Sequence, residues 1–266
     1  MYRKFYELKE LPFNVTADPN FFYLSKKHKE AFSYLSYGIK EKKGLIEITG
    51  EVGTGKTTLC KALINHLNQE TKTAFILNPN LPTTQLLQAI IEDFGLLIKK
   101  RSKISLLSEF NKFLLEELTS NHNVILIIDE AQNLNLRQLE EIRLLSNFET
   151  TKQKLIQIIL VGQPELHDKL NQFELRQIKQ RIAVRYSITP LGTDEIAEYI
   201  QHRLNIAGSN SNNIFSSSAI DRIFDFSKGV PRLINILCDR ALLAGFALEK
   251  REIDDKIIDK CIEELK

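Results

Sequence analysis

The sequence predicts an α/β fold, in which helices flank a parallel sheet and a smaller all-helical domain follows. Short apolar runs alternate with amphipathic helical stretches over about 45–188, an arrangement typical of strands joined by helices. The run 124–128 is aliphatic throughout, as expected for a strand buried on both faces. Strand-like runs stop after Pro190, and only helical patterns follow. We therefore expect a nucleotide-binding core at 1–190 and a helical domain at 191–266.

The expected elements follow from apolar spacing and from breaker residues. Residues 1–43 form a lead-in with proline and aromatic segments at 12–13 and 18–23, and then one helix at about 28–42 that Ser25 can cap. Apolar runs predict strands at 45–49, 73–77, 124–128, 155–161 and 182–188. Helical spacing predicts helices in the core at 56–69, 83–94, 104–119, 135–148 and 164–180. Beyond the core, the same spacing predicts helices at 193–206, 217–227, 231–248 and 254–264.

Composition excludes several classes of protein. With 43% hydrophobic residues the chain can bury a sizeable core, and a net charge of +2 gives no global attraction to nucleic acid or anionic membranes. The three cysteines are too few and too scattered for a disulfide framework, so reduced thiols are expected. No apolar run approaches the roughly 20 residues that span a bilayer. We expect a cytoplasmic protein whose membrane association, if any, goes through a partner.

One motif points to phosphate binding. The first predicted strand is followed directly by G-x-x-x-x-G-K-[ST], and a helix starts at Lys56. Glycines let backbone N–H groups approach a phosphate, the helix start favours anions, Lys56 reaches the β and γ oxygens, and the Thr57 hydroxyl can bind Mg²⁺. A dinucleotide-binding G-x-G-x-x-G is excluded because its third glycine is absent. The expected phosphate loop consists of Gly50, Glu51, Val52, Gly53, Thr54, Gly55, Lys56, Thr57 and Thr58.

Two acidic residues follow the aliphatic run. Asp129 and Glu130 stand at the carboxyl end of a predicted parallel strand, the end that faces the ligand in open α/β sheets. A carboxylate there can hold Mg²⁺, and a second one can polarise water for attack on a γ-phosphate. We expect Asp129 to serve the metal and Glu130 to serve the water.

Taken in order, these motifs resemble the AAA+ superfamily, in the branch that includes the ORC1-type origin-recognition ATPases. The resemblance is strongest to the ExeA (general secretion pathway protein A) type. It extends from residue 1 to about 262, and the matching strings lie at 5–13, 18–19, 50–58, 129–132, 161–166, 175–182 and 229–235. The resemblance implies a P-loop core with a helical lid, ATP as the nucleotide and Mg²⁺ as its metal.

The resemblance also implies roles for polar residues outside the two motifs. Gln163 would be the sensor near the γ-phosphate, and Arg232 would be the second sensor, in the lid. Arg181, or else Arg176, would be an arginine finger presented to a neighbouring subunit, so that the working unit would be a homo-oligomer.

Two pathways remain open for the expected ATP cycle. It could drive a protein partner in the assembly of a bacterial envelope machine for secretion, pili or exopolysaccharide export. Alternatively, the chain could be a DNA-associated regulator similar to the target-selecting ATPases of transposons, with nucleic-acid contact at the basic cluster 99–103. A nucleotide-dependent scaffold that hardly hydrolyses ATP is a third option.

Overall fold

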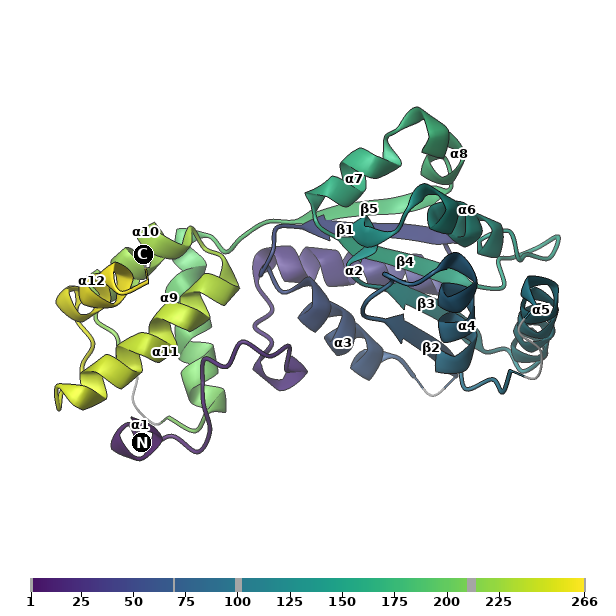
Figure 1. Ribbon diagram of the computed structural model, residues 1–266. Coiled ribbons are helices and arrows are strands. Elements are labelled where there is room, and N and C mark those ends of the chain that lie inside the picture. Colours follow the sequence, from purple (N-terminus) through teal and green to yellow (C-terminus); the bar gives the residue numbers. More distant parts are fainter. Residues whose placement is uncertain (1, 69, 99–101, 210–213, 266) are drawn as a thin grey trace. The chain divides into compact units, whose positions relative to one another are not determined.

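The computed structural model describes residues 2–68, 70–98, 102–209 and 214–265 (Figure 1). The chain divides into two compact units. The sheet unit comprises Glu30–Glu51 and Cys60–Ile188, and the helical unit comprises Met1–Lys29, Val52–Leu59 and Thr189–Lys266.

The sheet unit contains a five-stranded parallel sheet in the order β2-β3-β4-β1-β5, which confirms the predicted fold class. Its strands are β1 (Leu45–Gly50), β2 (Thr71–Ile76), β3 (Asn123–Ile128), β4 (Gln157–Gly162) and β5 (Ile182–Ile188). Thr49 pairs with Gly162, and Ile128 pairs with Leu160, so β1, β3 and β4 end at one edge of the sheet. We call this the carboxyl edge, and its first residues beyond the strands are Glu51, Asp129 and Gln163.

Helices cover both faces of this sheet. One face is packed by α4 (Thr83–Asp93), α5 (Lys103–Thr119), α6 (Leu136–Leu145), α7 (Pro164–Leu170) and α8 (Arg176–Lys179), whose apolar residues form one core with alternate strand residues. On the other face, α2 (Lys26–Lys40) approaches β1 closely. A Cβ atom at Gly38 would lie 2.5 Å from the Cδ1 atom of Ile46, so a larger residue at this crossing would require the Ile46 side chain to shift. The helix α3 (Lys56–His66) begins inside the phosphate motif.

The single helix predicted at 164–180 is wrong, because the chain breaks after α7. Gln172 adopts an extended conformation (φ −63°, ψ 149°), and a short 3₁₀ turn leads into α8. In an unbroken helix, Glu174 would lie four residues after the buried Leu170 and would therefore share its apolar face. The break instead buries Leu175 and leaves Phe173 75% exposed.

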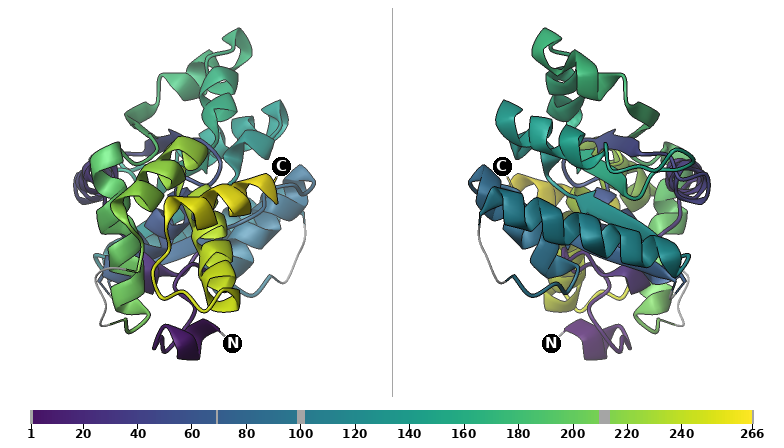
Figure 2. Two further views of the ribbon diagram at one scale, coloured as in Figure 1. Left: turned by 90° about the vertical axis from the view of Figure 1, so that its left-hand side faces the viewer. Right: turned by 90° about the vertical axis from the view of Figure 1, so that its right-hand side faces the viewer.

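The longer helices that follow the sheet in the helical unit lie close to the predicted bounds. These are α9 (Thr193–Ile206), α10 (Ser217–Ser227), α11 (Pro231–Ala247) and α12 (Asp255–Glu263), and the last three pack against one another (Figure 2). The side chains of Ser216 and Asp254 cap α10 and α12 by accepting hydrogen bonds from backbone N–H groups. Pro231 opens α11, where its missing N–H group is not needed.

The amino-terminal segment belongs to the helical unit. It contains the short helix α1 (Tyr2–Phe5) and contributes Tyr2, Tyr6, Leu8, Phe13 and Phe21 to the core of α9–α12. The guanidinium of buried Arg203 donates to the carbonyls of Pro12 (2.6 Å) and Asn14 (3.0 Å).

This grouping differs from the expectation that 1–190 form one core. Between α1 and α2 the lead-in segment consists of turns, irregular backbone and one short 3₁₀ helix, so the carbonyls of Pro12 and Asn14 are available to a buried cation on α9. Its aromatic side chains complete a core that the helices share with it.

Two general features concern the whole described chain. No helix within the described ranges combines the length and apolar character needed to cross a membrane. Cys60, Cys238 and Cys261 are buried thiols, and burial raises the pKa of Cys238 and Cys261 above the ordinary value.

Candidate functional site

The carboxyl edge of the sheet carries the two predicted acids. Asp129 is 2% exposed, its N–H group donates to the carbonyl of Ile76 (2.8 Å), and its Oδ1 accepts from the N–H group of Glu130 (2.9 Å). Glu130 itself has φ 51° and ψ 35°, a left-handed conformation that is uncommon outside glycine. The chain therefore turns sharply immediately after the buried strand, and the Asp129 carboxylate stabilises the turn.

Two glutamines hold the Glu130 carboxylate. Its Oε2 accepts from the Nε2 atoms of Gln132 (2.5 Å) and Gln163 (3.3 Å). The Gln132 Oε1 in turn accepts from the backbone N–H group of Gln163 (3.1 Å). Gly162 leaves room for this bridge, because a Cβ atom there would lie 2.8 Å from the Gln132 Oε1. The structure thus brings three predicted residues, Asp129, Glu130 and Gln163, to one edge.

Sequence reasoning gave Gln132 no role. Gln132 is the last residue of the Asp-Glu-Ala-Gln string that supported the family resemblance, and its place in that string could have indicated a role at the site. Its amide joins the turn after β3 to the start of α7, two segments separated by about thirty positions in the chain. Only the pairing of β3 with β4 makes that contact possible.

The phosphate loop from residue 52 onward lies in the helical unit. Gly53 (φ 81°) and Gly55 (φ 93°) have the positive φ values that favour glycine, while Thr54 and Lys56 are buried. The carbonyl of Gly53 accepts from the backbone N–H group of Arg232 (3.3 Å), and a Cβ atom at Gly53 would lie 2.6 Å from the Arg232 Cβ. The predicted second sensor therefore meets the loop through its backbone, and Arg232 is an exposed residue.

A residue that the sequence did not connect with the phosphate loop, His28, also contacts this loop. The Nε2 of His28 lies 2.9 Å from the carbonyl oxygen of Thr54, and its Nδ1 lies 2.7 Å from the Ser25 Oγ. His28 is 3% exposed, and burial lowers its pKa below the ordinary value of 6.5. In the sequence, the feature that could have indicated this arrangement was the Ser25-x-x-His28 spacing at the start of a helix.

The two candidate finger arginines lie away from the carboxyl edge. Arg181 precedes Ile182, which pairs with Leu45 at the start of β1, so Arg181 stands at the opposite edge of the sheet from Asp129. With a rise of about 3.3 Å per residue and about 4.8 Å between strands, their Cα atoms are roughly 20 Å apart. Arg176 is exposed on α8 and stacks on the ring of Phe173 at 4.2 Å.

Arg181 lines an open cavity of about 680 Å³, which we call the basic cavity. Its cations outnumber its acids: Lys42, Lys43, Lys152, Lys154 and Arg181 against Glu41 and Glu149. Lys154 forms an ion pair with Glu149. The side chain of Lys42 donates to the neutral amide of Gln153 (3.1 Å).

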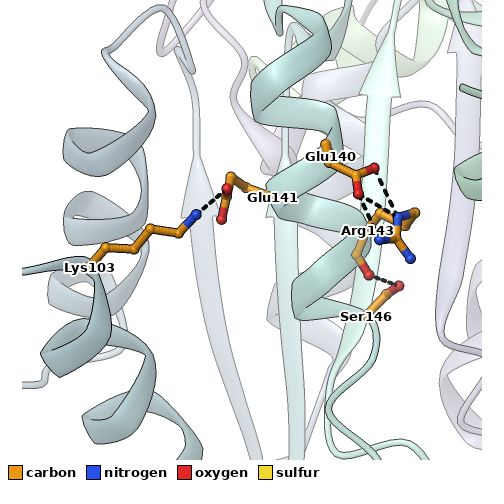
Figure 3. Close-up of polar contacts among 5 residues, drawn as sticks. All are labelled: Lys103, Glu140, Glu141, Arg143 and Ser146. Atoms are coloured by element: carbon orange, nitrogen blue, oxygen red, sulfur yellow. Dashed lines mark hydrogen bonds and ion pairs between the residues drawn. The ribbon is translucent and has the colours of Figure 1, made fainter. Parts of the chain in front are cut away.

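The basic cluster at 99–103 is described only in part. Lys99, Lys100 and Arg101 lie outside the described residues, and Lys103 forms an ion pair with Glu141 on α6 (Figure 3). On the same helix, Arg143 donates from Nε and Nη2 to Glu140 at 2.6–3.0 Å and holds the pKa of that carboxyl below its usual value. Lys103, the described basic residue of the cluster, is therefore already paired within the sheet unit.

The residues at the carboxyl edge suit magnesium better than zinc. In the part of the chain that the structure describes, no three His, Cys, Asp or Glu side chains form a cluster that could hold a metal. Mg²⁺ does not need such a cluster, because it is commonly held by one or two carboxylates together with substrate phosphates and water. A buried carboxylate such as that of Asp129 is the hard oxygen donor that this ion prefers.

Comparison with known proteins identifies the family of this chain. Residues 39–170 match the family model of an AAA domain. The chain is 42% identical over 95% of its length to general secretion pathway protein A of Aeromonas hydrophila, and it spans 46% of that relative, less than half its length.

Two solved structures have the same fold. Cdc6p of Pyrobaculum aerophilum aligns with 92% of this chain and 70% of its own, at a TM-score of 0.69 and 18% identity. The ORC2 protein of Aeropyrum pernix, solved as ADPNP–ADP complexes, aligns with 89% of this chain and 66% of its own, at a TM-score of 0.64 and 16% identity. The chain therefore belongs to the AAA+ superfamily, with the fold of ORC- and Cdc6-type proteins, and is a relative of general secretion pathway protein A.

Proposed function

We propose that this protein binds ATP with Mg²⁺ and hydrolyses it. The observation that carries the proposal is the Glu130 carboxylate, held by Gln132 and Gln163 beside Asp129 at the carboxyl edge of the sheet. A carboxylate that only covered a strand end would not need two amide donors to fix its orientation. The phosphate motif begins at the same edge, at the end of β1.

Each residue has a distinct part in the proposed reaction. Backbone N–H groups of residues 50–58 and the Lys56 ammonium would bind the phosphates. Asp129 and Thr57 would hold Mg²⁺, which neutralises charge on the β and γ oxygens when bound. Glu130 would orient the attacking water and accept its proton, and Gln163 would bond both Glu130 and the γ-phosphate.

The proposed working unit is a homo-oligomer in which Arg181, or else Arg176, serves the site of a neighbouring subunit. The separation of roughly 20 Å between Arg181 and Asp129 across the sheet supports action between subunits rather than within one. Arg232 would act as the second sensor from the helical unit, through its exposed side chain.

Steady-state ATPase assays at several protein concentrations test the proposal. Wild-type protein should hydrolyse ATP with a specific activity that rises with concentration, Lys56→Ala should lose nucleotide binding, and Glu130→Gln should bind ATP without turnover. Concentration-independent turnover would contradict the oligomer. Wild-type protein that binds ATP but does not turn it over would instead be the nucleotide-dependent scaffold.

We further propose that the cycle serves a protein partner in the assembly of a bacterial envelope machine. The support is the relationship to a protein named for the general secretion pathway, along 95% of this chain. The need for ATP fits a cytoplasmic location. Co-purification with envelope components that depends on ATP and is lost in Lys56→Ala would be the expected result.

The basic cavity favours a second candidate, a DNA-associated regulator. Five cations face two acids in this one cavity, whereas the whole chain carries a net charge of only +2. DNA binding that weakens steeply with salt and is lost in Lys42→Ala/Lys152→Ala would support this candidate, because phosphate contacts release counterions. No binding at about 50 mM salt would exclude it.

A further inference from the structure

Two successive carbonyls of the phosphate loop are held by the helical unit. The Gly53 carbonyl accepts from the N–H group of Arg232 (3.3 Å), and the Thr54 carbonyl accepts from the His28 ring (2.9 Å). All four residues belong to the same compact unit. The loop therefore receives its shape from two segments that lie far from it in sequence, the start of α2 and the start of α11.

The contacts of His28 identify its tautomer. A carbonyl oxygen only accepts hydrogen bonds, so the Nε2 atom that faces Thr54 carries the proton. On the other side of the ring, the Ser25 Oγ accepts from the backbone N–H group of His28 (3.2 Å), which leaves its own hydrogen to donate to Nδ1 (2.7 Å). The lowered pKa of the buried ring agrees with a neutral imidazole. Ser25 thus selects the tautomer that can donate to the loop.

The ring has little freedom to leave this position. The Phe22 ring packs against it edge-on with centroids 5.1 Å apart, and the space on the loop side is filled by Gly55. A Cβ atom at Gly55 would lie 3.1 Å from the His28 Nε2. The segment is also tied to α9, because the N–H group of Lys26 donates to the Glu195 Oε1 (2.8 Å).

Peptide geometry converts these contacts into an orientation for the loop. No peptide bond in the described chain is cis, and in a planar trans peptide the C=O and the following N–H point in opposite directions. Holding the Gly53 and Thr54 carbonyls toward Arg232 and His28 therefore turns the N–H groups of Thr54 and Gly55 the opposite way. Successive N–H groups aimed together form a concave anion site, whereas a carbonyl turned into that site would repel a phosphate.

We propose that His28 is a positioning residue for the phosphate loop, and that Ser25 sets its tautomer. The inference rests on the proposed binding of ATP. His28 touches no substrate in this scheme, and it acts by keeping the Thr54 carbonyl out of the anion site. The Gly55 N–H group is then presented to the phosphates before the nucleotide arrives.

The test compares ATP dissociation constants of three variants with those of the wild type. His28→Leu removes the donor and should weaken binding about tenfold, the effect of one well-placed hydrogen bond. His28→Gln keeps an N–H donor at similar reach and should restore affinity to within about threefold of wild type. Ser25→Ala should give an intermediate loss, and thermal unfolding of each variant checks that the fold is kept.

A spectroscopic measurement does not depend on the nucleotide. The ¹⁵N shifts of the His28 ring in wild-type protein should report a neutral ring protonated at Nε2, and Ser25→Ala should shift the population toward the other tautomer. Should His28→Leu fail to fold, the Gln variant and this measurement still decide the matter. A ring protonated at Nδ1, or a folded His28→Leu that binds ATP as tightly as wild type, would overturn the proposal. Wild-type protein that ignores ATP while its ring is protonated at Nε2 would instead remove the proposed function.

Discussion

The side-chain amide of Gln163 donates a hydrogen bond of 3.3 Å to the carboxylate of Glu130, and so joins the residue after β4 to the turn after β3. Both residues were expected at the site, but nothing in their spacing showed that they would bond to each other. Gln132 completes the contact by bonding Glu130 through its amide N–H and Gln163 through its amide oxygen. The orientation of the acid that would serve water is therefore set by residues that follow two neighbouring strands, β3 and β4.

Removing the Gln132 side chain should reduce turnover more than binding. Gln132→Ala takes away the closest donor to Glu130 and the acceptor of the Gln163 N–H group, so the carboxylate should sample unproductive orientations. We expect kcat to fall by about tenfold or more, with little change in KM, as for loss of an oriented general base. Gln85→Ala, at an exposed position of α4, is the control and should behave as wild type. A rise in KM at constant kcat would contradict the assigned role.

Mixing two inactive variants should restore ATPase activity if Arg181 acts between subunits. Arg181→Ala keeps its phosphate loop but offers no finger, whereas Lys56→Ala keeps its finger but binds no nucleotide. In mixed oligomers the second variant would complete the site of the first, and a finger is worth roughly 10³–10⁵ in rate. The same mixture made with Arg176→Ala distinguishes the two arginines. If neither mixture has an ATPase rate above the sum of the rates of its two variants measured separately, the site is not shared between subunits.

Acid should destabilise the protein through its buried histidine. The pKa of His28 is lowered from 6.5 by burial, so below that pH the unfolded chain binds the proton more readily than the folded chain. The stability that the neutral ring contributes is present above pH 6.5 and is lost as the pH falls toward the lower folded-state pKa. His202, whose pKa burial also lowers, acts in the same direction.

Urea unfolding between pH 7.5 and 5 measures this dependence. The free energy of unfolding should fall less with pH in His28→Gln than in wild type, because glutamine does not titrate. Identical slopes in the two proteins would show that the imidazole takes up its proton equally in both states, contrary to the lowered pKa.

The amino-terminal segment should contribute strongly to stability through Arg203. Arg203→Met keeps most of the side chain's bulk but leaves the carbonyls of Pro12 and Asn14 without their donor. Loss of these buried contacts should lower the free energy of unfolding by about 2–4 kcal/mol. Arg240→Met is the matched control, since its ion pair with Glu264 is exposed and should be worth less than about 1 kcal/mol. Equal effects of the two substitutions would refute the structural importance of Arg203.

The amino-acid sequence by itself determined the local features of this protein. The strand β3 is recognisable because a strand buried on both faces is aliphatic throughout, and the phosphate loop is recognisable because a close backbone approach to phosphate needs glycines in a short fixed spacing. The placing of Asp129, Glu130 and Gln163 at one edge also followed, since parallel strands end on the same side of a sheet. In the helical unit, the bounds of α9 and α10 followed from apolar periodicity and from the breaker residues that separate the helices.

Only the tertiary structure decided which distant residues meet. Local patterns did not show the break after Leu170. They also did not show three contacts between distant segments, namely the bridge through Gln132, the attachment of residues 1–29 to α9–α12 and the hydrogen bond from His28 to Thr54. Apolar periodicity predicts which face of a helix or strand is buried, but it does not predict which other element packs against that face. A single hydrogen bond produces no repeating pattern in the sequence, because it needs only one donor and one acceptor. The packing of the surrounding core determines where these two groups meet.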